Sequence, residues 1–417
     1  MSIEYPVTDE RPVYDDFHGV KVEDPYRWLE DDRSTETAAW VDAQNESSFS
    51  YLGSLPSRAD FASRLHRLMN YERESLPFKE GEFTYFYRNS GLQNQSVLFR
   101  RDAEGRESVF IDPNLLSEDG TTSMLGIAFS KSGELAAYQL SEGGADWRSV
   151  EVIDTDTLRV IDRIENVKFS GLSWYADDGF YYSSYDEPKG SELTAKTDRH
   201  KLYYHRVGED QAEDQLIFGA RDEEKHRYVS GYVTEDEYFL VIDASNTTSG
   251  NKLFMKDLRR ADQPLQTIVR EDSGDIRVLY SNQDEIYAYT NLNALNGKLI
   301  KFTLENFEQT DWEIIIDESD NALHVDVAGG YFFASYLKDA VTVTYQFDLS
   351  GRMLREIFLP AKGTAFGFQG KKTQELTYFT FENYHTPPTI FSLDLNSGGT
   401  EIHRSSEAKF SSESYES

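Results

Sequence analysis

A repeated two-part pattern constrains the fold of this chain more than any other feature. One part is an apolar stretch that ends in a turn, seen most plainly as N-K-L-F-M-K-D-L at residues 251–258. Further copies begin at Val97, Val150, Lys201, Lys298, Thr344 and Thr389. The other part precedes each copy and is a polar turn that opens into an aromatic stretch, as in T-E-D-E-Y-F-L-V from Thr234. The chain carries seven copies of this pair.

The spacing of the copies identifies the architecture. Equivalent positions in the second part are Phe83, Leu135, Phe180, Tyr238, Ile286, Tyr331 and Tyr378, which lie 52, 45, 58, 48, 45 and 47 residues apart. A period of about 40 to 50 residues is typical of propeller blades, because one small sheet buries both faces only by stacking on its neighbours. We therefore predict an all-β fold in which residues 72–403 form a seven-bladed β-propeller of four-stranded antiparallel blades.

Small residues mark the strands expected nearest the propeller axis. Glycine or serine occurs in G-I-A-F-S from Gly126, G-L-S-W from Gly171, S-G-Y-V from Ser230 and F-G-F-Q-G from Phe366. Glycine inside a strand indicates close approach of another backbone. We predict that these four stretches are innermost strands and line a central channel.

The first 71 residues have a different pattern. Apolar residues within 35–52 predict a helix capped by Ser34 or Thr35, and a second helix follows Pro56 with its apolar residues on one face. This short helical N-terminal segment needs a packing partner that a propeller rim does not supply. At the other end, residues 404–417 are polar and low in complexity, which predicts a linker.

Composition excludes several classes of partner. Lys and Arg number 42 against 74 Asp and Glu, so the formal net charge of −32 disfavours nucleic acid and anionic membranes. The chain has no cysteine, and no apolar run of the length that spans a bilayer. The N-terminus lacks the apolar core of a secretory signal. We expect a cytoplasmic protein, or a periplasmic one if a leader has been removed.

No catalytic set can be assembled from the residues present. The sequence has no G-x-S-x-G elbow, and S-G-N-K at 249–252 has neither of the companion motifs of S-x-x-K enzymes. The eight histidines show no metal-binding spacing; His200 and His205 flank an aromatic strand and are expected to be surface or hydrogen-bonded residues. We predict no catalytic residue, no cofactor and no metal site.

Phe169 is the aromatic residue with two competing interpretations. It stands in V-K-F-S-G-L-S-W, directly before a predicted channel strand. From the residues alone, packing between blades is the favoured interpretation, and a role at the channel is the alternative.

Several motifs resemble the prolyl oligopeptidase family of serine peptidases. They are D-D-F-H-G-V-K-V-E-D-P-Y-R-W-L-E-D at 15–31, A-W-V-D-A-Q-N at 39–45, G-L-Q-N-Q-S-V-L from Gly91, K-F-S-G-L-S-W from Lys168 and K-L-Y-Y-H-R-V-G-E-D-Q-A-E-D from Lys201. The resemblance extends over essentially the whole chain. It implies a propeller, without strand exchange between its first and last blades, that covers an α/β-hydrolase domain lying later in sequence.

The resemblance also implies that catalysis and substrate gating belong to different domains. The Ser, Asp and His of the family's catalytic triad lie in the hydrolase domain, so this chain is expected to be inactive alone and to act as the gate that admits short proline-containing peptides. It assigns Phe169 to the substrate side, with other pocket residues near Tyr228 and Asn246. The N-terminal segment is expected to pack on the hydrolase domain. The rival hypothesis is a free-standing propeller that acts as a binding platform for proteins or peptides.

The net charge generates a prediction about stability. Repulsion among the surplus carboxylates acts over distances beyond about 8 Å, where salt screens it. Moderate sodium chloride should therefore raise the melting temperature measured by calorimetry or fluorescence. An unchanged or lower midpoint in salt would mean that favourable ion pairs outweigh the repulsion.

Overall fold

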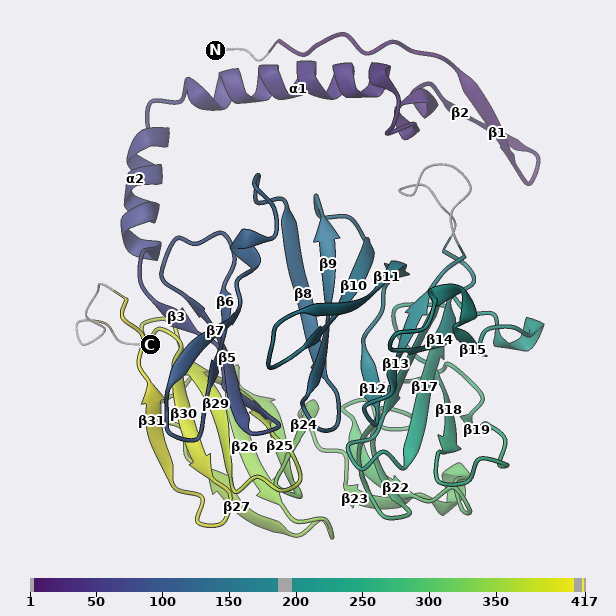
Figure 1. Ribbon diagram of the computed structural model, residues 1–417, viewed down its shortest axis with the longest axis vertical. Coiled ribbons are helices and arrows are strands. Elements are labelled where there is room, and N and C mark those ends of the chain that lie inside the picture. The colour runs from purple at the N-terminus through teal and green to yellow at the C-terminus, as the bar shows by residue number, and fades with distance from the viewer. Residues whose placement is uncertain (1–3, 187–196, 409–414, 416–417) are drawn as a thin grey trace. The chain divides into compact units, whose positions relative to one another are not determined.

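The chain forms two compact units. The computed structural model describes residues 4–186, 197–408 and 415 (Figure 1). One unit contains the described residues up to Met69 together with Asp186 and Thr197, and the other contains residues 70–185 and the described residues from Asp198 onward. In this described part of the chain, no helix is both long enough and apolar enough to cross a membrane.

The first unit contains the two helices that the sequence predicted. They are α1 (Thr35–Gly53) and α2 (Arg58–Met69). The Ser34 hydroxyl accepts a hydrogen bond from the Thr37 amide at 3.0 Å and so caps α1. The apolar face expected on α2 is largely exposed: Phe61 is 66% exposed and Leu65 is 57% exposed.

The first unit also contains a hairpin that was not predicted. Strands β1 (Val13–Phe17) and β2 (Val20–Asp24) pair antiparallel across the two-residue turn formed by His18 and Gly19. Both turn residues have positive φ, 57° and 88°, as a tight hairpin turn of this hand requires. His-Gly is a weaker hairpin signal than Asn-Gly, which is why the pattern escaped detection.

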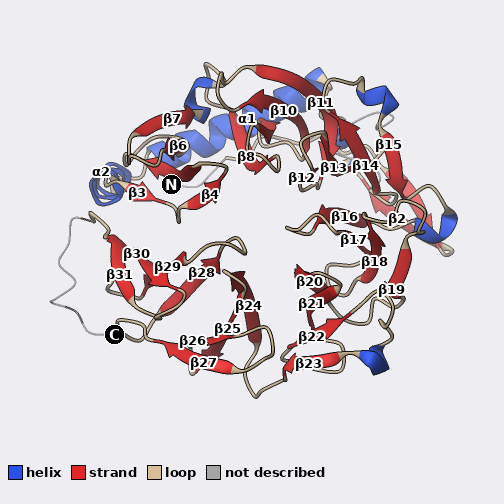
Figure 2. Ribbon diagram, turned by 60° about the horizontal axis from the view of Figure 1, so that its bottom comes forward, coloured by secondary structure: helices blue, strands red, loops and turns tan. Residues whose placement is uncertain are grey.

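The second unit is a ring of seven antiparallel sheets, as predicted (Figure 2). Blade 1 contains β3 (Arg73–Glu74), β4 (Phe78–Glu80), β5 (Phe83–Asn89), β6 (Val97–Arg101) and β7 (Glu107–Ile111). Blade 2 contains β8 (Thr122–Phe129), β9 (Leu135–Glu142), β10 (Trp147–Asp154) and β11 (Val160–Lys168). Blade 3 contains β12 (Ser173–Tyr175), β13 (Gly179–Ser184), β14 (Lys201–Arg206) and β15 (Gln215–Phe218). Blade 4 contains β16 (Tyr228–Val233), β17 (Phe239–Ser245), β18 (Lys252–Asp257) and β19 (Gln266–Val269).

The remaining three blades repeat the arrangement. Blade 5 contains β20 (Ile276–Asn282), β21 (Glu285–Thr290), β22 (Lys298–Phe302) and β23 (Glu313–Ile316). Blade 6 contains β24 (Leu323–Ala328), β25 (Tyr331–Lys338), β26 (Val341–Phe347) and β27 (Met353–Ile357). Blade 7 contains β28 (Thr364–Gln369), β29 (Leu376–Glu382), β30 (Thr389–Asp394) and β31 (Thr400–Arg404). Short 3-10 helices lie at Arg27–Glu30, Pro113–Leu115, Gln211–Glu213, Asp222–Glu224 and Gln309–Asp311.

The two parts of the sequence repeat occupy fixed positions in each blade. The aromatic stretch forms the second strand, and the apolar stretch that ends in a turn forms the third. The predicted innermost strands β8, β12, β16 and β28 do lie nearest the axis (Figure 2). In blade 1 the innermost strand is split into β3 and β4, and Pro77, which has no amide proton to donate, lies in the break. Of the predicted linker, residues 409–414 and 416–417 lie outside the described residues, and β31 extends to Arg404.

Apolar packing joins each blade to the next one along the chain. The buried apolar residues fall into six clusters, and each cluster joins two successive blades, from the pair of blades 1 and 2 to the pair of blades 6 and 7. Stacked rings dominate some of these interfaces, such as Phe333 of blade 6 on Phe368 of blade 7 at 5.5 Å. Each sheet therefore obtains its core by sharing it.

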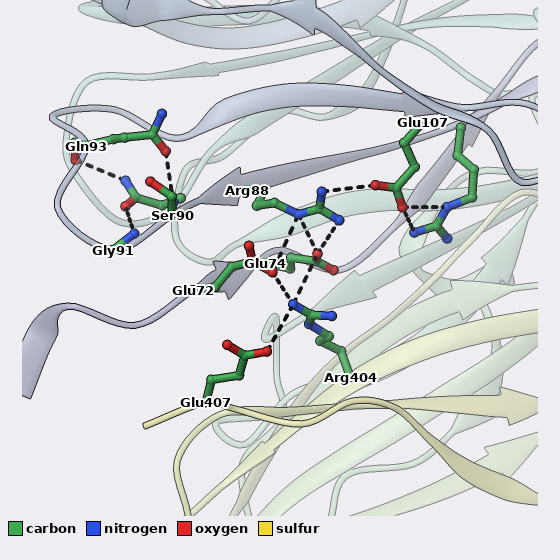
Figure 3. A network of polar contacts seen from close by, with 11 residues as sticks. Glu72, Glu74, Arg88, Ser90, Gly91, Gln93, Glu107, Arg404 and Glu407 are labelled. Carbon is green, nitrogen blue, oxygen red and sulfur yellow. Dashed lines mark hydrogen bonds and ion pairs between the residues drawn. The ribbon is translucent and has the colours of Figure 1, made fainter. Parts of the chain in front are cut away.

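The junction of blades 7 and 1, which closes the ring, differs from the other six. Within the described residues neither terminal blade adds a strand to the other, as the family resemblance implied, and no buried apolar cluster of the same kind spans the two blades. A network of charged side chains occupies this seam (Figure 3). Arg404 of β31 pairs with Glu72 and lies 3.8 Å from Glu74, while Arg88 of β5 bonds Glu74 at 2.6 Å and Glu107 at 2.9 Å.

One glycine and a set of cross-ring contacts complete the closure. A side chain at Gly367 of blade 7 would collide with Leu76 of blade 1, and its φ of +102° also favours glycine. Across the axis, the backbone amide of Lys372 in blade 7 donates to the Glu235 carboxylate of blade 4 at 3.0 Å. The Lys131 ammonium of blade 2 donates to the Glu235 carbonyl at 2.6 Å. Glu235 thus links three blades that are not neighbours.

A buried histidine joins blades 2 and 3. The His205 ring of β14 is fully buried and lies between two carboxylates, with Nδ1 2.7 Å from Asp214 and Nε2 3.1 Å from Asp162 of β11. Burial opposes protonation of the ring, but the hydrogen bonds to Asp214 and Asp162 outweigh it and raise the pKa of His205. His205 is therefore a hydrogen-bonded core residue, one of the two alternatives that the sequence left open.

The His205 site generates a prediction about pH. Because its pKa is higher in the folded state, the stabilisation is complete below the ordinary value of 6.5 and is lost as pH rises through the raised value. His205→Gln should cost about 3 kcal/mol near pH 6, since two nearly buried carboxylates lose their cation.

Denaturant melts of both proteins across a pH series check this. The difference between wild type and variant should shrink as pH increases above neutrality. A difference that stays constant with pH would show that His205 contributes only packing.

Candidate functional site

The backbone at Phe169 is held in an unusual conformation. Phe169 follows β11 and precedes β12, in the connection between blades 2 and 3, and its φ is +52°. Positive φ is uncommon for a bulky residue and costs on the order of 1 kcal/mol, so it persists only where the surroundings impose it. The side chain is 39% exposed and belongs to none of the six interblade clusters.

An aromatic cluster surrounds Phe169; we use this term for Phe169, Tyr185, His200 and Tyr228. The Phe169 ring lies 6.2 Å from Tyr185 at the end of β13 and 6.3 Å from Tyr228 at the start of β16. Tyr185 in turn stacks on His200 at 4.3 Å. Residues from three blades therefore meet at one end of the propeller.

His200 fixes the cluster through two backbone hydrogen bonds. Its Nδ1 accepts from the Val229 amide of blade 4 at 2.9 Å, so its Nε2 carries the proton and donates to the Lys168 carbonyl of blade 2 at 2.9 Å. Burial lowers the pKa of His200 to about 4, which leaves the ring neutral near pH 7. The ring is therefore a fixed neutral spacer between two blades and not an acid or base for catalysis.

A cation lies beside the exposed ring of the cluster. The Lys168 ammonium is 5.1 Å from the centre of the Phe169 ring and 5.0 Å from that of Trp147, and the residue is 5% exposed. This geometry is a cation–π contact on two rings. It holds Phe169 in place while leaving part of the ring accessible to a ligand.

The structure brings together some of the predicted site residues. Tyr228 contacts Phe169 directly. Asn246 lies one step away, because its side-chain oxygen accepts a hydrogen bond from the Arg227 amide at 3.2 Å. Sequence reasoning missed Tyr185 and His200. The available signal was the longest repeat interval, 58 residues between Phe180 and Tyr238, within which both lie.

The cluster is suited to binding and not to covalent chemistry. Its members are three aromatic rings and one neutral imidazole, with the Lys168 ammonium beside them. Among the described residues, no serine or carboxylate is paired with His200 by a hydrogen bond. Nucleophilic catalysis requires a nucleophile within reach of a base. The site can hold an apolar group, such as a proline or aromatic side chain, against fixed rings.

Comparisons with known proteins agree with this architecture. A sequence profile described as "Prolyl oligopeptidase, N-terminal beta-propeller domain" matches residues 5–406. The prolyl endopeptidase of Elizabethkingia miricola is 45% identical over 416 residues, which cover 99% of this chain and 59% of the relative. The dual function macrocyclase-peptidase POPB of Amanita bisporigera is 29% identical, and the match covers 92% of this chain and 56% of the relative.

Solved structures show the same fold. One, from a study of two prolyl endopeptidases and their inter-domain dynamics, aligns with a TM-score of 0.88 and 26% identity, covering 98% of this chain and 61% of that one. Prolyl oligopeptidase B from Galerina marginata, bound to a 35mer hydrolysis and macrocyclization substrate, aligns with a TM-score of 0.84 and 26% identity, covering 98% and 62%. This chain thus spans about three fifths of the length of its relatives. The profile match over residues 5–406 shows that the chain belongs to the prolyl oligopeptidase family, as an N-terminal β-propeller domain.

Proposed function

We propose that this chain is the substrate-gating portion of a prolyl oligopeptidase, a serine endopeptidase that cleaves short peptides after proline. The observation that carries the proposal is the aromatic cluster, which presents the Phe169 ring at one end of a propeller of this family. The sequence offers no nucleophile elbow of its own, so the chain acts with an α/β-hydrolase domain of the same parent protein. No cofactor is needed for this role.

Exposed apolar residues support a partner at the Phe169 end. We use this name for the end that holds the connections between successive blades and between the second and third strands of each blade. Four apolar residues in these connections are 80% exposed or more: Leu115, Leu295, Phe358 and Tyr384. In the connections at the opposite end, only Leu158 among the described residues is an exposed large apolar residue, at 40%. Apolar exposure that favours one end of the propeller is typical of a surface that another domain covers.

The first unit supports the same partner. Phe49 of α1 is 67% exposed and Phe61 of α2 is 66% exposed. We propose that this segment packs on the hydrolase domain and that its boundary with the propeller lies near residue 71. The surplus of acidic residues argues against nucleic acid and membrane partners and is consistent with a cytoplasmic location, or a periplasmic one if a leader has been removed.

Mixing two fragments tests the function. The part of the Elizabethkingia miricola prolyl endopeptidase that lies beyond the matched region supplies the second fragment, and that relative's own propeller fragment is the positive control. This chain should restore cleavage of a chromogenic peptide after proline, and neither fragment alone should do so. If the control pair is active and this chain restores nothing, a free-standing binding platform becomes the better explanation.

Phe169→Ala tests the site in that reconstituted enzyme. Loss of one partly exposed aromatic contact should cost about 1 to 2 kcal/mol of binding, seen chiefly as a higher KM. Leu158→Ala is the matched control, because Leu158 also has positive φ, 57°, and is 40% exposed, but lies at the other end of the propeller.

Steady-state kinetics and a denaturant melt on both variants separate binding from packing. If Phe169 instead packs between blades, its truncation should cost about 3 to 5 kcal/mol of stability. A large drop in the melting midpoint with unchanged KM would overturn the assignment of Phe169 to the site.

A further inference from the structure

The innermost strands of blades 2 to 7 are almost free of charge. Among β8, β12, β16, β20, β24 and β28, the charged residues are Arg277 and Asp326, with His324 beside the latter. Charged residues make up 28% of the whole chain, so this depletion is pronounced. The exceptions are not scattered around the ring, because they lie on β20 and β24, the innermost strands of two neighbouring blades.

Arg277 faces a cavity without a partner. A cavity of about 390 Å³ is lined by β16, β20, β24 and residues 369–370, and both Arg277 and Asp326 are on its wall. Arg277 is exposed, and its guanidinium makes no hydrogen bond or ion pair with any residue in 4–186, 197–408 or 415. With 74 acidic residues against 42 basic ones, an exposed arginine that forms no ion pair with any described residue requires an explanation.

Asp326 does not neutralise Arg277, because its own partners are already in place. One oxygen accepts a hydrogen bond from the Gln369 amide at 2.8 Å, and the other lies 3.3 Å from the His324 ring. Asp326 is nearly buried, whereas the His324 side chain is 60% exposed. The hydrogen bond to Asp326 raises the pKa of His324, so the pair approaches neutrality as the ring gains its proton. A second carboxylate, that of Asp243 in β17, interacts with Arg277 at longer range without forming an ion pair, and burial raises its pKa to about 7. The Arg277 guanidinium therefore keeps its hydrogen-bonding positions open toward the cavity.

The position of Arg277 along the axis relates it to the aromatic cluster. Each blade has four antiparallel strands, so the chain returns after every blade to the end where it began, and all innermost strands start at the Phe169 end. Arg277 is the second residue of β20 and lies toward this end. Glu235, which follows β16, lies toward the other end of the cavity, where Lys372 and Lys131 hold it.

We propose that Arg277 binds the C-terminal carboxylate of an oligopeptide that enters the cavity from the Phe169 end. This inference rests on the proposed function, since it takes the ligand to be a peptide, and adds a second anchor to it. The planar guanidinium fork matches a carboxylate in two parallel hydrogen bonds. Polyanions are excluded, because Asp326 and Glu235 line the same cavity and the chain as a whole is strongly acidic.

Apolar groups in the same cavity as Arg277 fit the rest of a peptide. Tyr232, Val278 and Leu279 line the cavity next to it. The Tyr232 hydroxyl is already bonded to the Val278 carbonyl at 3.0 Å, so the ring presents an apolar face. An uncharged peptide ending in one carboxylate therefore finds a cation and an apolar wall in the same cavity.

The test compares three acetylated octapeptides of one uncharged, proline-containing sequence. The first ends in a free carboxylate and the second in an amide. The third has glutamate as its last residue and also ends in an amide, so its carboxylate is on a side chain. Binding to the chain is measured by calorimetry. The variants are Arg277→Gln, Phe169→Ala and Arg159→Gln. Arg159 is an exposed arginine in the turn between β10 and β11, so Arg159→Gln makes the same change in net charge away from the cavity.

The free acid should bind about tenfold more tightly than the amide, because a charge-assisted pair is worth about one such factor. Arg277→Gln should abolish this preference, and Arg159→Gln should leave it intact. Tight binding of the glutamate peptide would support the carboxylate site and extend it to acidic side chains. Equal binding of acid and amide, a preference that survives Arg277→Gln, or no binding at all overturns the proposal.

The failure of this inference and the failure of the proposed function give different results. If acid and amide bind equally but Phe169→Ala weakens both, the peptide site at the aromatic cluster stands and the Arg277 site falls. If the preference for the free acid depends on Arg277 while Phe169→Ala has no effect, the Arg277 site stands and the peptide site at the aromatic cluster falls. Thermal melts of each variant establish that it is folded; Arg277 is exposed and unbonded, so its replacement should not unfold the ring.

Discussion

Apolar contact between the faces of successive blades holds this propeller together, since a single four-stranded sheet has two faces and no partner of its own. Six interfaces are built in this way, each from side chains that both blades contribute. The burial of these residues is worth roughly 25 cal/mol per Å² of apolar surface. Blade stability is therefore a property of neighbouring pairs, and the ring depends on every pair being complete.

The seventh interface, between blades 7 and 1, differs from the other six because polar contacts form most of it. The first and last blades meet through ion pairs of Glu72, Glu74, Arg88 and Arg404, and not through a shared apolar cluster in the described residues (Figure 3). The pair of Arg404 and Glu72 is about a third exposed, and ion pairs of this exposure contribute about 1 kcal/mol or less each and weaken in salt. The contacts of Glu235 with blades 2 and 7 add a second set of ties across the axis. Closure of the ring is thus polar where the rest of the structure is apolar.

The stacked blades also determine how the site is made rigid. Phe169 sits in a connection between two blades, where a loop would ordinarily be free to move. Here the neighbouring Lys168 carbonyl accepts a hydrogen bond from His200, and His200 accepts one from Val229. Three blades therefore hold one aromatic ring. Their contacts offset the conformational free energy of the positive φ at Phe169. On the proposed function, a ring held in this way would lose little entropy on contact with a peptide.

Much of the fold could be predicted from the sequence because it depends on local patterns. The period of the repeat gave the number of blades, the alternation within each copy gave the strands, and Ser34 marked the start of the first helix within one residue. These features follow from which side chains each short segment must bury. The β1–β2 hairpin escaped because its turn residues carry a weak signal. Phe169 was singled out by its motif, while packing between blades was the favoured interpretation from the residues alone. The structure shows its ring partly exposed and outside the six interblade clusters.

The sequence by itself determined seven blades, four strands in the usual blade and a helical segment before them, because each blade repeats the same local burial pattern. Only the tertiary structure decided which residues meet. Tyr185 of blade 3 and Tyr228 of blade 4 meet at Phe169, and Arg404 reaches Glu72 across more than three hundred residues. Arg277 is left without an ion pair among the described residues. These contacts arise when the ring closes and brings distant segments together, and no periodicity within a segment specifies a partner in another.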